Sequence, residues 1–275
     1  MKKSINAWTV PGSFTFEETF ACVSRAGFDG IELNVDECGH SAHSLYVGMP
    51  SSEISAIADL SKKYNLPVSG ISTSQWGKNP IGAVEPELRA KGFELLRCQV
   101  DLANAFGADG ILIVPGGIGE NLSIKAAYDS AKETFRSWKS YIEDQNVMIG
   151  VENVWNNFFI SPFDMASFLD ELSIKNLGAY FDVGNVAIFA RPEHWIEILG
   201  KRIQKIHIKD FKKKGSNAGT FVNLLEGDVA WEKVVPALRK AGYDSYLTAE
   251  LDTMEKSNDY MMDITNKALE HIISL

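Results

Sequence analysis

The sequence is poor in cysteine and has no long apolar run, and each shortage argues against a class of protein. Its three cysteines, Cys22, Cys38 and Cys98, are odd in number and show no CxxC spacing, which disfavours a disulfide framework or a zinc knuckle. We therefore expect reduced thiols in a cytoplasmic protein. No run of about 18 apolar residues is present, so no membrane span is expected. The N-terminal MKKSINAWTVPG lacks the apolar stretch of a signal peptide.

Positive charge and histidine are also scarce. The chain has 27 Lys and Arg against 36 Asp and Glu, a net charge of −9, and because such a chain repels phosphate backbones we expect no nucleic-acid partner. The densest basic cluster, Lys209 with residues 212–214, is by default a solvated loop. Of the five histidines, His40 and His43 form an HxxH pattern that we interpret as a loop. No GxGxxG follows the first apolar segment, and GGIGEN at 116–121 has the wrong spacing for a dinucleotide site.

The chain does contain short, β-branched apolar segments along its whole length. They lie at residues 5–10, 30–35, 67–73, 110–115, 147–153, 178–183, 203–209 and 245–251. Longer stretches with helical periodicity separate most of them, such as FEETFACVSRAG with its terminal glycine stop. This alternation predicts an α/β fold, a (β/α)₈ TIM barrel, as a single domain over residues 1–275. An open doubly wound sheet is the alternative, which the missing GxGxxG disfavours.

Four charged or ligating side chains stand at the ends of the last four predicted strands: Glu152, Asp182, His207 and Glu250. In such barrels these ends meet at one mouth, where three carboxylates would repel one another unless a divalent cation joined them. Oxygen ligands and one imidazole suit Mn²⁺, Mg²⁺ or Co²⁺, and Zn²⁺ is possible. Each residue also has a structural alternative. His207 in KIHIKD could be a core histidine, Asp182 a cap of the turn DVGN, and Glu250 a lysine partner.

Further residues at the predicted mouth are candidates for substrate binding. Lys209 lies two positions after His207 on the same side of its strand and could bind a phosphate, although a salt bridge at the rim is equally plausible. Glu32 ends the second strand and should point into the same mouth, as a substrate contact or a support for the ligands. Three tryptophans follow strand ends and could wall a sugar pocket or pack in the core: Trp8, Trp76 and Trp155.

The stretches GVENVWNNF, AYFDVGN, KIHIKDF, LLEGDVAW and LTAEL resemble those of the xylose-isomerase-like sugar phosphate isomerases and epimerases. The likeness is strongest to L-ribulose-5-phosphate (or L-xylulose-5-phosphate) 3-epimerases and to hexulose-6-phosphate isomerase-like proteins. It covers nearly the whole chain and is densest over 148–252. The resemblance implies one divalent metal ion held by the four strand-end residues, with Glu152 and Glu250 as the acid/base pair.

The sequence departs from the non-phosphorylated ketose 3-epimerases at two positions. Asn185 stands where they carry a histidine, and Phe158 where they carry a second glutamate. The resemblance therefore implies 3-epimerisation of a ketose phosphate through a cis-enediolate, with Asn185 among the substrate-binding candidates. Free-ketose isomerisation, an inosose-dehydratase-like lyase, an endonuclease IV-like nuclease and a non-catalytic sugar-binding protein are the alternatives. The expected partner is a small sugar or sugar phosphate, and a homo-oligomer is possible.

Overall fold

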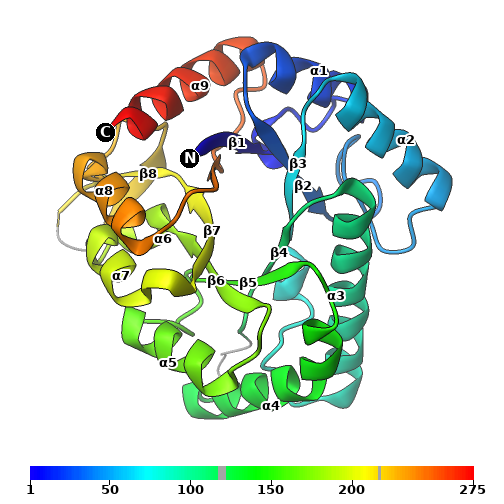
Figure 1. Ribbon diagram of the computed structural model, residues 1–275, viewed down its shortest axis with the longest axis vertical. Helices are drawn as coiled ribbons and strands as arrows, with labels where there is room; N and C mark the ends of the chain where they lie inside the picture. The colour runs from blue at the N-terminus through cyan, green and yellow to red at the C-terminus, as the bar shows by residue number, and fades with distance from the viewer. Residues whose placement is uncertain (117–121, 216–217) are drawn as a thin grey trace.

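Eight parallel strands close into a barrel, which confirms the predicted (β/α)₈ TIM barrel and excludes the open sheet (Figure 1). The computed structural model describes residues 1–116, 122–215 and 218–275, so most of the GGIGEN segment lies outside the described residues. Around the barrel the strands follow the order β1, β10, β7, β6, β5, β4, β3, β2. Their bounds are β1 (Lys2–Asn6), β2 (Gly30–Val35), β3 (Val68–Thr73), β4 (Gly110–Ile113), β5 (Met148–Glu152), β6 (Leu177–Asp182), β7 (Ile203–Ile208) and β10 (Tyr246–Ala249).

Helices form a ring outside the strands (Figure 1). The main ones are α1 (Phe16–Ala26), α2 (Ser51–Lys63), α3 (Pro86–Phe106), α4 (Ile124–Glu143), α5 (Pro162–Leu172), α7 (Pro192–Leu199), α8 (Trp231–Ala241) and α9 (Asn258–Ser274). Helix α1 begins at a capping box between Thr15 and Glu18 and ends at Gly27, whose φ of 88° is left-handed, as the glycine stop predicted. Within the described ranges, no helix is both long and apolar enough to cross a membrane.

Long polar side chains in the barrel interior pack against glycines of other strands. Strand β7 shows the alternation of a parallel strand, with Lys205 and His207 directed inward. A Cβ atom on Gly110 would lie 2.9 Å from Cδ of Lys205, and one on Gly150 would lie 2.8 Å from Cδ2 of Tyr180. Glycines on β4 and β5 thus leave room for long side chains from β6 and β7. The interior is therefore filled by packed side chains, and the site at the mouth lies directly above them.

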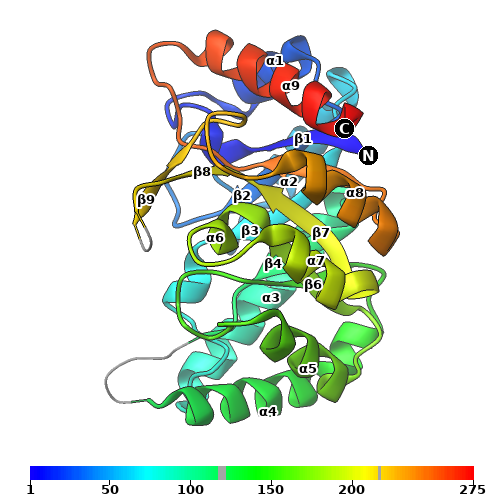
Figure 2. The ribbon, with the colours of Figure 1, turned by 90° about the vertical axis from the view of Figure 1, so that its left-hand side faces the viewer.

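An antiparallel hairpin of β8 (Asp210–Lys213) and β9 (Gly219–Val222) follows β7 directly. Figure 2 shows it on the side of the barrel away from both chain termini, together with the short helix α6 (Val183–Ala187). Because β1 starts near the N-terminus and all the barrel strands are parallel, this is the end at which the strands finish. The hairpin therefore forms part of the wall of the barrel mouth.

Candidate metal and catalytic site

The four predicted ligands come together at the mouth. Glu152 and Asp182 end strands β5 and β6, His207 lies in β7, and Glu250 follows β10. Each offers an oxygen or nitrogen atom within 4.8 Å of those of the other three. Three of the side chains are at most 8% exposed, and that of Glu250 is 21% exposed. These residues could be grouped from the sequence because each stands at or just beyond the end of one of four neighbouring barrel strands.

The electrostatics of this cluster are those of crowded carboxylates. Burial raises the pKa of Glu152 to about 7. Burial and the nearby charge of Glu250 also raise the pKa of Asp182, despite the opposing effect of Lys209. For Glu250 itself, burial is outweighed by Lys209 and His207, and its pKa is lowered. The Lys209 ammonium is thus the local counter-charge, 2.6 Å from Oε2 of Glu250 and 3.1 Å from Oδ2 of Asp182.

The residues present fit a divalent cation. Oδ2 of Asp182 is buried and, despite the ion pair with Lys209, it accepts no well-directed hydrogen bond from the described residues. Oδ1 of the same carboxylate caps helix α6 by accepting from the backbone N–H of Asn185, at 2.7 Å. Asp182 therefore caps the helix through Oδ1, while its Oδ2 is available as a metal ligand. Three carboxylates and one imidazole form the donor set of a hard or borderline cation.

His207 faces carboxylates on both sides of its ring. Its Nδ1 atom lies 3.3 Å from Oε1 of Glu152 and 3.4 Å from Oε2 of Glu250. Its Nε2 atom lies 2.6 Å from Oε2 of Glu32, on the opposite, deeper side. Glu32 is fully buried beneath the cluster, where it accepts hydrogen bonds from Asn6, at 2.6 Å, and from the hydroxyl of Tyr180. Because carboxylates lie on both sides of its ring, His207 is not in the purely apolar environment of a core histidine.

Asn153 is a residue that the sequence analysis did not single out. Its amide donates to the backbone oxygen of Asp182 and its Oδ1 accepts from the backbone N–H of Asp182, both at 2.9 Å. The side chain of Asn185 in turn donates to the backbone oxygen of Asn153, at 3.0 Å. These bonds join the ends of β5 and β6 and fix the spacing of Glu152 and Asp182. The position of Asn153 directly after Glu152 was the only available signal.

Aromatic side chains wall the mouth above the cluster. Trp155 is 53% exposed, donates to the backbone oxygen of Asn185 at 2.7 Å, and stacks on Phe221 of the hairpin with ring centroids 5.0 Å apart. A cavity of about 500 Å³ opens beside Lys209 and Glu250, with Trp8 and Phe221 among its walls. This volume suits a small organic ligand. Trp76, by contrast, is 2% exposed and belongs to the core.

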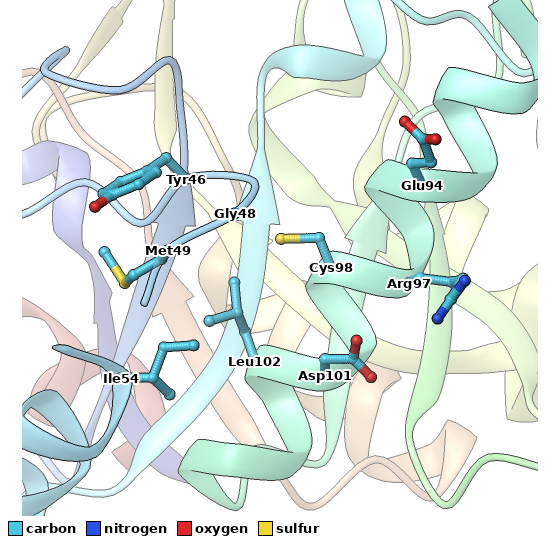
Figure 3. A pocket seen from close by; sticks show the side chains of 9 residues that line it. All are labelled: Tyr46, Gly48, Met49, Ile54, Glu94, Arg97, Cys98, Asp101 and Leu102. Carbon is cyan, nitrogen blue, oxygen red and sulfur yellow. The ribbon is translucent and has the colours of Figure 1, made fainter. Parts of the chain in front are cut away.

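Two other features lie apart from this site. His43 of the HxxH pair is 3% exposed, and its ring nitrogens contact the backbone oxygens of Phe14, at 2.8 Å, and Ala7, at 3.1 Å. His40 is exposed. A separate pocket of about 300 Å³ lies between α2 and α3 on the outside of the barrel, and contains none of the four cluster residues (Figure 3). Burial raises the pKa of the Cys98 thiol in this pocket to about 11, which disfavours the reactive thiolate at neutral pH.

Curated proteins resemble this chain in sequence at low identity. The uncharacterized protein MJ1311 of Methanocaldococcus jannaschii is 25% identical over 178 residues, 62% of this chain and 60% of that protein, so the chain spans less than two thirds of this relative. The Haemophilus influenzae protein named "Putative L-ribulose-5-phosphate 3-epimerase SgbU" is 22% identical over 271 residues, which cover 93% of this chain and 90% of that protein.

Solved structures share the fold over nearly the full length. An L-ribulose 3-epimerase superposes with a TM-score of 0.81 at 18% identity, covering 99% of this chain and 94% of that one. The IolI protein with a bound zinc atom superposes with a TM-score of 0.80 at 14% identity, covering 100% and 98%. The family model described as xylose isomerase-like TIM barrel matches residues 20–274. With its closed barrel and this match over nearly its whole length, the chain belongs to the xylose isomerase-like TIM barrel family.

Proposed function

We propose that the protein is a divalent-metal-dependent sugar epimerase that inverts the carbon next to the carbonyl of a ketose. The observation that carries this proposal is the position of two glutamates, Glu152 and Glu250, in one cluster at the mouth, with a cavity beside Glu250. The similarity of the chain to a relative named as a 3-epimerase, and to solved epimerases, supports an isomerase activity. A cytoplasmic location and a homo-oligomer stay predictions.

Glu152, Asp182, His207 and Glu250 would hold the cation. When bound there, it would polarise a substrate carbonyl and make the adjacent C–H more acidic, which a carboxylate alone cannot achieve. Glu152 ends β5 and Glu250 follows β10, with β6 and β7 between these two strands, so their carboxylates can reach a substrate carbon from different sides. In this proposal one glutamate removes the proton and the other returns a proton to the opposite face.

The role proposed for Lys209 changes with the geometry. We predicted that it binds a substrate phosphate or forms a salt bridge at the rim; its side chain is 14% exposed, and its ammonium already contacts Glu250 and Asp182. The contacts support a role in holding the Glu250 carboxylate in place. If so, Lys209→Met should slow the turnover of a ketose and of its phosphate ester equally. A loss confined to the phosphate ester would support the phosphate role instead, and parallel kinetics on the two substrates distinguish the roles.

The substrate proposal covers ketoses and ketose phosphates. The relative named as an L-ribulose-5-phosphate 3-epimerase supports the ester, and the solved L-ribulose 3-epimerase supports the free sugar. The metal-loaded protein should be incubated in D₂O with a panel of both kinds, and followed by NMR. We expect deuterium at the carbon next to the carbonyl together with a new epimer. A panel that shows no exchange would overturn the proposal, and a dehydrated product would indicate the lyase alternative.

A further inference from the structure

His207 can offer only one ring nitrogen to a metal ion while the other carries a proton. Which nitrogen is free depends on the hydrogen bond that the other one makes. Nε2 lies 2.6 Å from a single acceptor, Oε2 of Glu32, whereas Nδ1 faces Glu152 and Glu250 at 3.3 and 3.4 Å, among the predicted ligands. The shorter and better-defined contact is the one on the side away from the mouth.

We propose that Glu32 is a positioning residue for this site. Its carboxylate accepts the Nε2 proton of His207, and so fixes both the tautomer and the direction of the ring, with the Nδ1 lone pair aimed at the cluster. This inference rests on the proposed metal-dependent function. Of the two roles predicted for Glu32, a substrate contact or a support for the ligands, the inference selects the support, since its side chain is fully buried and the ring of His207 lies between it and the other carboxylates.

Glu32 is itself held in one orientation. Oε2 accepts from Nδ2 of Asn6 at 2.6 Å, and Oε1 accepts from the hydroxyl of Tyr180. Both of these partners are fully buried. A Cβ atom on Gly70 would approach Oε1 to 3.0 Å, so the glycine leaves the carboxylate its space. The carboxylate therefore has two directed donors besides His207, and it cannot turn away without losing them.

The ring of His207 has a second restraint from the same network. Tyr180 packs against it with ring centroids 4.7 Å apart, while its hydroxyl reaches Glu32. One tyrosine thus contacts both members of the pair. A carboxylate behind a metal-binding histidine also makes the imidazole a stronger electron donor, and loss of such a partner typically weakens metal binding by about 10- to 100-fold. A purely structural network would instead affect unfolding and leave metal affinity unchanged.

The test uses Glu32→Gln, which keeps the volume but removes the charged acceptor, and Tyr180→Phe, which keeps Glu32 but frees its Oε1. Ser4→Ala is the matched control, because Ser4 is a fully buried barrel residue whose hydroxyl bonds Ser69 and does not contact His207. Two measurements are made on each protein: the Mn²⁺ dissociation constant by calorimetry, and the ¹⁵N shifts of the His207 ring with diamagnetic Zn²⁺ bound. The His207 signal is assigned by its loss in His207→Gln.

We expect Glu32→Gln to weaken Mn²⁺ binding by about 10- to 100-fold and to mix the two tautomers in the ¹⁵N spectrum. Tyr180→Phe should weaken binding severalfold, and it provides the test if Glu32→Gln does not fold. Ser4→Ala should bind within twofold of the wild type. Glu32→Gln that binds Mn²⁺ as the wild type does, or keeps its Nε2-protonated pattern, overturns the inference but not the proposed function. A wild-type chain that binds no divalent cation overturns both.

Discussion

Asp210, the last residue of KIHIKD, should be one of the most costly side chains to remove. Its carboxylate is 1% exposed and accepts four hydrogen bonds from the segment that follows it. The donors are the backbone N–H groups of Phe211 at 2.9 Å, Leu225 at 3.0 Å and Val229 at 3.2 Å, and the indole of Trp231 at 3.0 Å. This one carboxylate thereby links the start of the hairpin to the start of α8 through hydrogen bonds.

The magnitude follows from these four bonds. Hydrogen bonds to a charged acceptor contribute about 1.5 to 3 kcal/mol each, but water will enter the space left by Asp210→Ala and satisfy part of the lost bonding. Counting about 1 kcal/mol for each donor, we expect the free energy of unfolding to fall by about 4 kcal/mol. Gly227 shows how tightly the acceptor is enclosed, since a Cβ atom there would lie 2.0 Å from Oδ1.

Urea unfolding followed by far-UV circular dichroism measures this loss. Asp228→Ala is the control from the same loop, because the Asp228 side chain is 39% exposed and its carboxylate bonds Lys212 and the backbone of Lys213. It should change stability far less. Asp210→Ala should also raise KM, since Phe221 and Asn223, which line the cavity, lie in the segment that it releases. If Asp210→Ala unfolds within about 1 kcal/mol of the wild type, the reasoning from buried hydrogen bonds is wrong here.

Three further predictions concern the metal and the two glutamates. Chelation should abolish epimerisation while the far-UV circular dichroism is unchanged, because strands and helices form the core and the ligands lie only at the mouth; loss of that spectrum would make the metal structural. Because burial raises the pKa of Glu152 to about 7, a proton competes with the cation for it. Metal affinity should therefore fall as the pH drops below 7, approaching about tenfold for each pH unit, and a flat calorimetric profile across that range would contradict this. Glu152→Gln and Glu250→Gln should each retain metal but fail to exchange substrate hydrogen starting from opposite epimers; wild-type turnover in either would refute the two-base mechanism.

The residues at the strand ends were predictable because each charged or ligating side chain interrupts an otherwise apolar strand. Glu152, Asp182, His207 and Glu250 each stand beside apolar residues, and a buried charge needs a partner. Parallel strands in a closed barrel all finish at one end, so fold and site followed from the same pattern. The first strand was placed less accurately, at 5–10 instead of Lys2–Asn6. The cause is local: Asn6 caps a short 3₁₀ helix over Ala7–Thr9, whose apolar residues resemble a strand.

The partners of the charged residues were not predictable. Lys209 was correctly placed on the side of His207, but both a phosphate and a carboxylate can satisfy an ammonium. Only the positions of Glu250 and Asp182 show that two carboxylates are within its reach. Asn185 was likewise judged by comparison with a histidine at that place, whereas its side chain bonds the backbone of Asn153. A sequence pattern predicts the direction in which a side chain points, whereas identifying the group that it contacts requires interatomic distances.

The support for His207 illustrates this limit most clearly. Glu32 is 175 positions away from His207 in the chain, and Tyr180 is 148 positions from Glu32. No periodicity links three strands at such separations, because each of these residues looks like an ordinary inward position of its own strand. Closure of the barrel brings them together, and the glycine at position 70 leaves the space that Glu32 occupies. The four cluster residues can thus be found by reading each strand separately, whereas the residues proposed to orient His207 become visible only across the interior. Substitutions there should therefore act on metal binding without touching the substrate cavity.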